Sequence, residues 1–460
     1  MEIDIKKYKT SEDRLNTANL NSAARKIYIE TYGCQMNVAD SELVVSIMVD
    51  AGFAITDNVE EADIIFINTC AVRDNAEKKI RNRLIALNFY KKKKPGLIIG
   101  VLGCMAERLK EKLVQEEQIV DIVAGPDAYR SLPSLVEEAE GGSKAINVLL
   151  SREETYAEIS PIRRNANKVS AFISITRGCD NMCAFCVVPF TRGRERSRDP
   201  KDIITELRQV IIEGYKEVTL LGQNVDKYNW NNGEVKFAKL LRMTAEVDST
   251  VRIRFATSYP QDFTDEVITT IADYDNICKY IHLPVQSGSN AMLDKMKRGY
   301  TREWYMNRIH AIRKIIPDCA ISTDMISGYC GETEEDHKDT LNLMKEVSYD
   351  FAYMFKYSVR PNTYAARNYE DDVDEETKKR RLSEVIEVQQ NLSLESNQKD
   401  IGKIFDVLVE GASKKSEERY YGRNSQNKVI VFPKGNSKIR DYVNVKVTSC
   451  TSATLLGEIV

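Results

Sequence analysis

Residues 171–186 read AFISITRGCDNMCAFC and join an apolar stretch to three closely spaced cysteines. The apolar stretch has the pattern of a buried strand. Cys179, Cys183 and Cys186 follow it with C-x3-C-x2-C spacing. Three thiolates suit three irons of a [4Fe–4S] cluster, and the fourth iron is then left without a protein ligand. A zinc site is the alternative, but it normally takes four ligands, and the nearest histidine in the sequence is His282.

The alternation of strand and helix continues through residues 165–397. Helical stretches such as 202–214 and 302–316 separate further apolar runs. The strand candidates are residues 171–176, 217–222, 252–257, 279–284, 319–325 and 351–357. Six β/α units favour a full or partial β/α barrel, whose active site lies at the carboxyl ends of its strands.

Three more cysteines occur in residues 25–141, each between a strand candidate and a helix candidate. The strand-like stretches end at Cys34, Cys70 and Cys104, which are 36 and 34 residues apart, about one strand–helix repeat each. Continuous apolar strands that alternate with helices indicate a parallel sheet covered on both faces. Because successive parallel strands end on the same edge, we expect the three thiols to meet there. The alternative is three separate buried cysteines.

Changes in composition divide the chain into further segments. Residues 1–24 are predicted to be a flexible leader, and residues 142–164 a linker. The charged residues 371–400 have helical spacing and predict a bridging helix. Residues 398–460 contain short β-like runs between Gly, Asn and Ser, which is typical of a small antiparallel barrel or OB-like module. The predicted fold class is therefore α/β, with a parallel-sheet domain, a central β/α barrel and a C-terminal β-barrel.

Composition excludes several classes of protein. With 42% hydrophobic and 29% charged residues, the 460-residue chain can bury sizeable cores, so it is not collagen-like, wholly disordered or a small disulfide scaffold. It shows no stretch resembling a signal peptide or a membrane span, so we expect a cytoplasmic protein with reduced thiols. The net charge of −3 hides an asymmetry, because residues 398–460 carry 11 Lys and Arg against 7 Asp and Glu. That excess favours phosphate contacts.

The C-x3-C-x2-C motif after the first barrel strand resembles the signature of the radical S-adenosylmethionine (SAM) superfamily. Within that superfamily the chain is similar to the methylthiotransferases, over roughly residues 25–460, and its tail is similar to the RNA-binding module named TRAM. The matching stretches are YGCQMNVADSE (32–42), NTCAVRDNAEKK (68–79), GCMAER (103–108), HLPVQSGS (282–289) and STDMISGYCGETEED (322–336).

The CQMN stretch that begins at Cys34 resembles the bacterial tRNA branch of this family. The resemblance implies a transferase that adds a methylthio group to C2 of N6-isopentenyladenosine at position 37 of tRNA. That C–H bond is unactivated, so the reaction needs a radical rather than an acid or base, and we predict no catalytic side chain. Other branches act on threonylcarbamoyl-adenosine or on a ribosomal protein, and these stay as alternatives. A non-enzymatic iron–sulfur sensor that binds RNA is another.

The resemblance also implies the cofactors and partners. We call Cys179, Cys183 and Cys186 the SAM-site cysteines, and Cys34, Cys70 and Cys104 the auxiliary cysteines. The first set would hold a SAM-cleaving [4Fe–4S] cluster, and the second an auxiliary [4Fe–4S] cluster that carries the sulfur. One SAM would methylate that sulfur and a second would yield the radical. The implied partners are the tRNA anticodon stem-loop, an electron donor such as flavodoxin or ferredoxin, and a sulfur source, with the chain acting as a monomer.

Positions in the family's barrel imply further contacts with SAM. Phe185 resembles the aromatic residue that packs near the SAM adenine, with an ordinary core phenylalanine as the alternative. Residues at the ends of the second and fourth barrel strands match positions that contact SAM in other members of the family. The alternative is that they are turn residues without a ligand. They are Gly222, Gln223, Asn224, Gln286 and Ser287.

Basic residues supply the candidates for contact with RNA. The alternating arginines of residues 192–198 suit bidentate binding of the SAM carboxylate or of phosphate, with a solvated charged face as the alternative. Residues 91–94, four lysines, are interpreted as a solvent-exposed loop. The predicted RNA-binding residues are Arg192, Arg194, Lys414, Lys415, Arg419 and Arg423.

The remaining cysteines carry no clear chemical signal. Cys330 stands where the family usually has proline, which affects the expected geometry of its loop. We interpret Cys278, Cys319, Cys330 and Cys450 as buried or incidental thiols.

Overall fold

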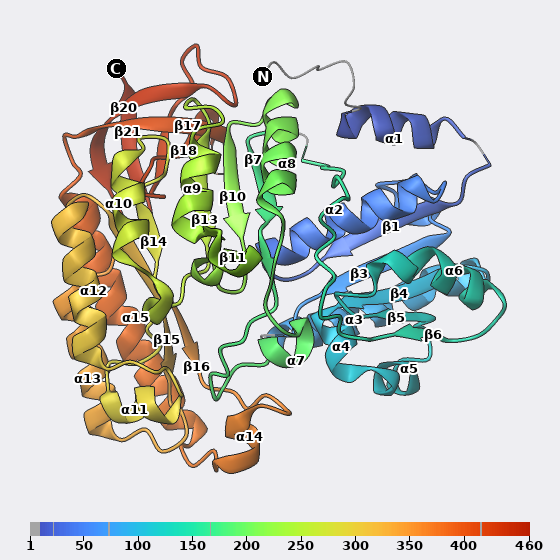
Figure 1. Ribbon diagram of the computed structural model, residues 1–460, viewed down its shortest axis with the longest axis horizontal. Coiled ribbons are helices and arrows are strands. Elements are labelled where there is room, and N and C mark those ends of the chain that lie inside the picture. Colours follow the sequence, from blue (N-terminus) through green and yellow to red (C-terminus); the bar gives the residue numbers. More distant parts are fainter. Residues whose placement is uncertain (1–9, 22, 72–73, 166, 415) are drawn as a thin grey trace.

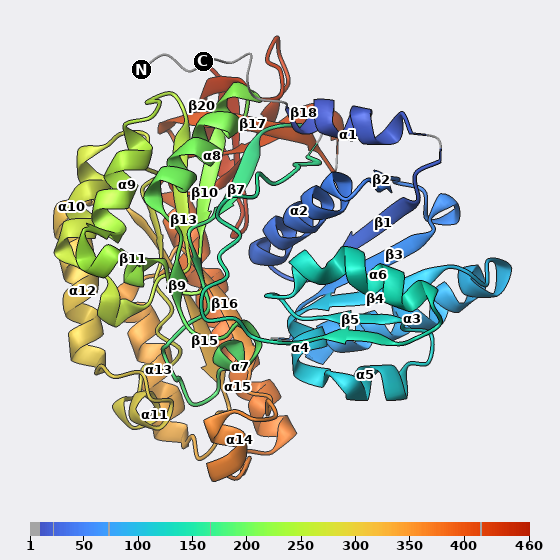
Figure 2. The same ribbon diagram turned by 45° about the vertical axis from the view of Figure 1, so that its right-hand side comes forward.

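The computed structural model describes residues 10–21, 23–71, 74–165, 167–414 and 416–460. Three units follow one another along the chain: a parallel α/β sheet, an open β/α barrel and a small closed β-barrel (Figure 1). Figure 2 shows the N-terminal sheet beside the central unit, with the C-terminal barrel at one end of the central strands. The predicted fold class is confirmed.

The N-terminal unit is a six-stranded sheet in which every neighbouring pair is parallel. The strand order is β2-β1-β3-β4-β5-β6. β3 and β4 are buried throughout, because an apolar cluster packs on each face of the sheet. The strands are β1 (Lys26–Thr31), β2 (Ala54–Ile55), β3 (Ile64–Thr69), β4 (Ile98–Gly103), β5 (Ile122–Ala124) and β6 (Ala145–Asn147). The helices are α2 (Gln35–Asp50), α3 (Asp74–Lys93), α4 (Cys104–Leu109), α5 (Glu111–Glu116) and α6 (Leu132–Glu140).

Two segments that the sequence predicts to be irregular are ordered. Residues 145–147, in the predicted linker, form β6 and pair with β5. Part of the predicted leader forms helix α1 (Ser11–Asn19), where Arg14 pairs with Asp50 at 2.8 Å and the first residue donates to Glu213. Helix α1 is polar and strand β6 has only three residues, so neither offers a hydrophobic pattern long enough to predict it, and both are ordered by contacts with other elements.

The central unit contains all six predicted strands. They form two three-stranded parallel sheets, β13-β10-β7 and β14-β15-β16, which a single bridge between Ile253 and Ile277 connects into an open barrel. The strands are β7 (Ser170–Ser174), β10 (Glu217–Leu221), β13 (Arg252–Ala256), β14 (Tyr280–His282), β15 (Ala320–Ser327) and β16 (Phe351–Lys356). The helices are α7 (Val188–Arg192), α8 (Pro200–Ile212), α9 (Phe237–Ala245), α10 (Asp265–Asp273), α11 (Asn290–Lys295), α12 (Arg302–Ile315), α13 (Glu334–Val347) and α14 (Tyr364–Asn368). The unit also contains two short antiparallel strand pairs: β8 (Thr176–Arg177) with β9 (Arg196–Ser197), and β11 (Asn229–Trp230) with β12 (Val235–Lys236).

The C-terminal unit is a closed five-stranded barrel attached to the amino ends of the central strands. Helix α15 (Glu375–Gln398) leads into it, and its strand order is β17-β18-β19-β21-β20. At the start of β13, Arg252 pairs with Asp406 at 2.9 Å and Arg254 donates to the Asn424 carbonyl at 2.7 Å. The strands are β17 (Ile404–Ser413), β18 (Ser416–Arg423), β19 (Val429–Pro433), β20 (Tyr442–Cys450) and β21 (Leu455–Ile459).

Candidate functional site

The auxiliary cysteines follow three strands that are neighbours in the N-terminal sheet. Cys34 precedes α2 after β1, Cys70 directly follows β3, and Cys104 directly follows β4. Cys70 and Cys104 are buried and Cys34 is exposed. Burial raises the pKa of the Cys104 thiol, against the opposing effect of a nearby arginine. The parallel topology therefore brings the three thiols to one edge of the sheet, where one of them meets solvent.

Two buried asparagines hold the loops that carry these cysteines. The Asn37 side chain accepts from the Cys34 backbone N–H at 3.3 Å and donates to the Thr69 carbonyl at 3.1 Å. Asn68 donates to the Asn37 carbonyl at 2.9 Å. Gly33 is also required, because its φ is +139° and an added Cβ would lie 2.7 Å from the Cys70 Cβ. Sequence analysis missed these asparagines, although both lie within the quoted motifs.

The SAM-site cysteines lie in one loop at the carboxyl end of β7. Gly178 precedes them with φ +78°, and an added Cβ there would lie 2.0 Å from the Arg194 carbonyl oxygen. Burial raises the pKa of Cys179 to about 11 and that of Cys186 to about 12. Iron coordination would overcome this penalty, because a metal-bound thiol is deprotonated.

Each cysteine set supplies three thiols, the ligand type that holds [4Fe–4S] clusters. Within the described ranges, no three His, Cys, Asp or Glu side chains converge on a position for one metal ion. A [4Fe–4S] cluster distributes its thiolate ligands over separate irons, so its cysteines need not converge in that way.

A buried arginine contacts the SAM-site cysteines. The Arg298 guanidinium is 4% exposed and donates to the Cys183 Sγ at 3.2 Å, to the Pro284 carbonyl at 2.7 Å and to the Tyr300 hydroxyl at 2.9 Å. Among the described residues it forms no ion pair with a carboxylate, and the Tyr259 ring lies 4.4 Å away. Because a buried charge is costly without a counter-charge, this environment fits an anionic thiolate cluster at Cys183.

A second buried arginine contacts the auxiliary cysteines from the central unit. Arg192 ends α7, which follows the SAM-site loop, and its Nε donates to the Cys104 Sγ at 3.2 Å. Its Nη1 lies 2.7 Å from Asp40, and neither terminal nitrogen has a well-aligned hydrogen-bond acceptor among the described residues. The predicted contact of Arg192 with RNA is corrected by this position: the side chain is 4% exposed and points into the protein. Its remaining N–H groups fit a sulfur-rich acceptor.

Asp40 connects the two units at this point. It pairs with Arg177, just before the SAM-site cysteines, at 2.8 Å and with Arg192 at 2.7 Å. Burial acts to raise the pKa of Asp40, but the two guanidinium groups together hold it below its ordinary value. Arg196, next to them, pairs with Asp127 at 2.8 Å. Of the four alternating arginines of residues 192–198, Arg192 and Arg196 therefore join the two units. The other two pair within the central unit.

The residues after β10 differ in their availability to a ligand. Gly222 has no room for a side chain, since an added Cβ would lie 2.1 Å from Thr176 Oγ1. Gln223 accepts from the backbone N–H that precedes the SAM-site cysteines, so it holds their loop. Asn224 donates to Asp262 at 2.7 Å, while its buried Oδ1 has no hydrogen-bond partner among the described residues. Asn224 is thus the member of this set that is arranged to receive a donor.

Three further residues that are predicted to contact SAM lie after β14 and in the cysteine loop, and two of them contact other side chains of the protein. Gln286 has φ +80°, a conformation that a non-glycine residue seldom adopts outside functional or strained positions. Ser287 is fully buried, with its Oγ 3.2 Å from Thr340 Oγ1. Phe185 is half-buried and meets the Tyr329 ring edge-to-face at 6.4 Å.

The predicted RNA-binding residues of the C-terminal unit divide into exposed and internal ones. Lys414 and Arg419 are exposed, and Lys415 lies outside the described residues. Arg423 is half-buried and pairs with Glu410 at 2.5 Å and with Glu217 at 3.1 Å, so it links the barrel to the central unit, and its contact with RNA stays a prediction. In the central unit, exposed Arg194 pairs with Asp180 at 2.6 Å.

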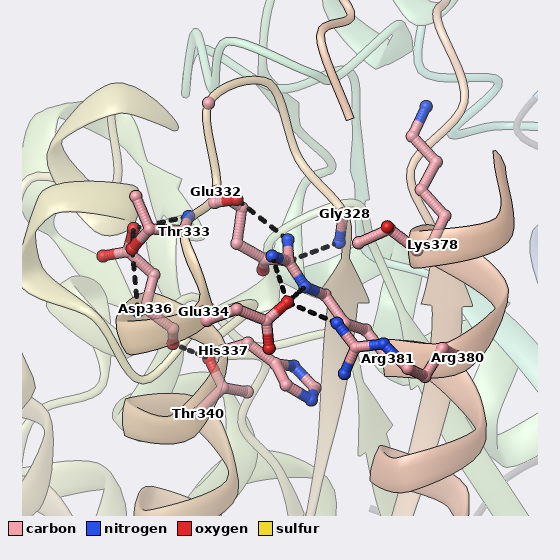
Figure 3. A network of polar contacts seen from close by, with 12 residues as sticks. Gly328, Glu332, Thr333, Glu334, Asp336, His337, Thr340, Lys378, Arg380 and Arg381 are labelled. Atoms are coloured by element: carbon pink, nitrogen blue, oxygen red, sulfur yellow. Dashed lines mark hydrogen bonds and ion pairs between the residues drawn. The ribbon is translucent and has the colours of Figure 1, made fainter. Parts of the chain in front are cut away.

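The loop that contains Cys330 is fixed by polar contacts to α15 (Figure 3). The Gly328 N–H donates to the Glu332 carboxylate at 2.7 Å, and Arg381 donates to the same carboxylate at 2.9 Å. Cys330 packs in a small apolar cluster with Ala184 of the SAM-site loop. This cysteine therefore supports the loop by packing. Of the remaining four cysteines, three are buried and the last is half-buried: Cys278, Cys319, Cys330 and Cys450.

Comparison with known proteins gives the same three-part organisation. Residues 26–125 match the uncharacterized protein family UPF0004, residues 173–344 the radical SAM superfamily, and residues 398–460 the TRAM domain. The tRNA-2-methylthio-N(6)-dimethylallyladenosine synthase of Amoebophilus asiaticus is 60% identical over 449 residues, which cover 95% of this chain and 92% of that protein. The synthase of Chloroherpeton thalassium is 58% identical over 437 residues, 95% of this chain and 96% of that one.

The chain belongs to the tRNA-2-methylthio-N(6)-dimethylallyladenosine synthase family. It is therefore a radical SAM enzyme and a transferase. Its fold also resembles that of a solved radical SAM methyltransferase, TsrM from Kitasatospora setae, a structure with cobalamin and a [4Fe–4S] cluster bound. The TM-score is 0.57 at 13% identity, over 75% of this chain and 77% of that one, so the likeness concerns the fold alone.

Proposed function

We propose that this enzyme adds a methylthio group to C2 of N6-isopentenyladenosine at position 37 of tRNA, next to the anticodon. The observation that carries the proposal is the meeting of the two cysteine sets at one interface, where Arg192 follows one set and donates to Cys104 of the other. The identity of 60% to a named synthase, over nearly the full length of both chains, supports the same substrate.

The SAM-site cysteines would hold the cluster that binds SAM, and the auxiliary cysteines the cluster that carries sulfur. When bound, these groups supply a 5′-deoxyadenosyl radical and a methylated sulfur at the expense of two SAM. The chain itself orients both sites: Arg298 and Arg192 donate to one cysteine of each set. Asp40 holds the two loops together by its ion pairs. Burial of Cys179 and Cys183 limits the access of water to the cluster that they would hold.

The remaining parts of the proposal concern boundaries and partners. The auxiliary domain would span residues 25–141, the radical SAM core 165–397 and the RNA-binding TRAM domain 398–460. The partners would be the tRNA anticodon stem-loop, a flavodoxin or ferredoxin and a sulfur source, with a monomeric enzyme in the cytoplasm. No helix in the described part of the chain has the length and apolar character to cross a membrane.

Mass spectrometry of tRNA nucleosides from a deletion strain tests this function. Loss of the gene is expected to remove 2-methylthio-N6-isopentenyladenosine and to accumulate its unthiolated precursor. A plasmid copy should restore the product, and a copy with the SAM-site cysteines changed to alanine should not. Unchanged levels of this nucleoside would contradict the proposal, and a change confined to a threonylcarbamoyl derivative would point to the other substrate.

A further inference from the structure

One half of the central barrel presents aromatic side chains that are partly exposed to solvent. In the parallel pair β15–β16, Ser322 lies beside Phe351 and Asp324 beside Tyr353, so these side chains share a sheet face. His282 of β14 lies beside Ser322 on the same face. We call this set the β14–β16 face.

The helices lie behind the opposite face of this sheet. Ala352 is 1% exposed, and Met354 packs against the main apolar core together with residues of α13 and α15. By contrast, Phe351 is 47% exposed and Tyr353 44% exposed. The alternation along β16 therefore places the large aromatic side chains on the side that the helices leave open.

The aromatic side chains of this face are arranged in a row. The rings of Phe351 and Tyr353 are 4.9 Å apart and nearly perpendicular, and the His282 ring lies 5.6 Å from Tyr353. His282 is oriented by Ser322, whose Oγ lies 2.8 Å from its Nδ1. Neighbouring exposed rings of this kind offer flat apolar faces on which a base can stack.

Among the described residues, helix α2 of the N-terminal unit packs against the other half of the barrel. Met36 and Ala39 of α2 pack against Leu221, Phe172 and Ala256, which belong to β10, β7 and β13. Figure 2 shows α2 next to β7, whereas β15 and β16 lie further along the barrel. The exposed fractions of Phe351 and Tyr353 show that the β14–β16 face stays partly accessible to solvent.

This face connects the C-terminal barrel to the cysteine sites. At the amino ends of the strands, Lys428 of the C-terminal barrel lies 3.4 Å from Asp350, the residue before Phe351. The Lys279 N–H, just before β14, donates to Ser425 at 2.8 Å. The cysteine loop lies at the carboxyl ends, about 20 Å away for a six-residue strand. The face therefore lies between the C-terminal barrel and the cysteine loop, along the way that an RNA loop held by that barrel would take to the clusters.

We propose that Phe351 and Tyr353 form a stacking surface for unpaired bases next to the adenosine that is modified. This rests on the proposed function, since it assigns a place to the same RNA. Single-stranded RNA is bound by stacking its splayed bases on aromatic side chains, in addition to phosphate contacts from basic residues. The exposed Lys414 and Arg419 of the C-terminal barrel would supply the phosphate contacts. The β14–β16 face would supply the stacking.

The two kinds of contact differ in their dependence on salt, and binding measurements separate them. Fluorescence anisotropy with a labelled anticodon stem-loop carrying N6-isopentenyladenosine gives Kd at several salt concentrations for the full chain. The double variant F351A/Y353A is expected to bind about tenfold more weakly with an unchanged salt slope, because stacking releases no counterions. R419A is expected to reduce the slope of log Kd against log salt concentration by about one, the value for one lost phosphate contact.

Matched variants keep the result interpretable. F351Y/Y353F retains both aromatic rings and should bind as the wild type does, while F351L/Y353L retains apolar bulk and should bind weakly. F89A removes a similarly exposed aromatic ring on α3 and should have no effect. Iron content and SAM cleavage without RNA report that each variant is folded.

Wild-type binding by F351A/Y353A, or a loss of salt slope in that variant, would overturn the stacking surface. If the wild type modifies the stem-loop and only this result fails, the proposed function stands. If the wild type neither binds nor modifies the stem-loop, both proposals fall.

Discussion

The two cysteine sets differ in how the chain brings them together. The SAM-site cysteines lie in one short loop, and the arginine that contacts them, Arg298, belongs to the same unit. The auxiliary cysteines come from three strand ends, and their arginine, Arg192, belongs to the neighbouring unit. Arg298 has no carboxylate partner among the described residues, whereas Arg192 shares Asp40 with Arg177. The first site is self-contained, and the second depends on the packing of two units.

Removing each cysteine set has the largest expected effect. The triple variant C34A/C70A/C104A should lose about four irons per chain and still cleave SAM when reduced. C179A/C183A/C186A should lose the same amount of iron and all formation of 5′-deoxyadenosine. Iron assays and chromatography of SAM products measure both, with C450A as the control. If C34A/C70A/C104A kept its iron, the auxiliary site would be wrong.

Replacement of Arg298 tests the unbalanced charge at the SAM site. R298M removes a buried cation next to Cys183, so it disfavours the more negative reduced cluster and should lower the midpoint potential of that cluster. We expect the rate of SAM cleavage to fall at least tenfold, with partial recovery in R298K. Redox titration followed by electron paramagnetic resonance measures the potential. An unchanged potential in R298M would show that the contact is structural only.

Replacement of Arg192 tests whether the auxiliary site depends on its neighbour. In a C179A/C183A/C186A background, where auxiliary iron is the signal, R192M should reduce the iron content about twofold and alter the spectrum of the remaining cluster. The effect is smaller than at Arg298 because Asp40 already balances part of the charge. R192M alone should leave SAM cleavage near the wild-type rate. A loss of cleavage with full auxiliary iron would reverse the assignment of this arginine.

The ionisation of Glu107, close to the auxiliary cysteines, should have a smaller effect, on the stability of the fold at different pH. Burial raises the pKa of this carboxyl to about 7, against the lowering effect of Lys110. The folded state therefore favours the protonated form, and its stabilising contribution is complete below about pH 4.5 and is lost as the pH rises through 7. Between pH 5 and pH 8, the melting temperature should decrease less with rising pH for E107Q than for the wild type. An equal decrease of the melting temperature in both proteins would mean that this carboxyl does not titrate in that range.

The strands and the positions of the cysteines could be predicted from the sequence, whereas most contacts between units could not. The six barrel strands and the three strand-end cysteines follow from local patterns: apolar runs, their spacing and the parallel topology. Burial of Arg192 does not, since four arginines in alternation have the same local pattern on a surface or at an interface. Only the position of Asp40, far away in the sequence, decides between the two. Arg298 was missed for a related reason, because no local motif shows that its neighbours contain no carboxylate.

The central claim is that one cysteine set serves SAM cleavage and the other serves sulfur transfer. Product analysis with the reconstituted enzyme tests this most directly. The reduced enzyme is given SAM and a stem-loop carrying N6-isopentenyladenosine, and the nucleosides and 5′-deoxyadenosine are quantified together. The wild type should form both 5′-deoxyadenosine and the methylthio nucleoside, and C34A/C70A/C104A should form 5′-deoxyadenosine alone. Methylthio product at the wild-type level without the auxiliary cysteines would contradict the account.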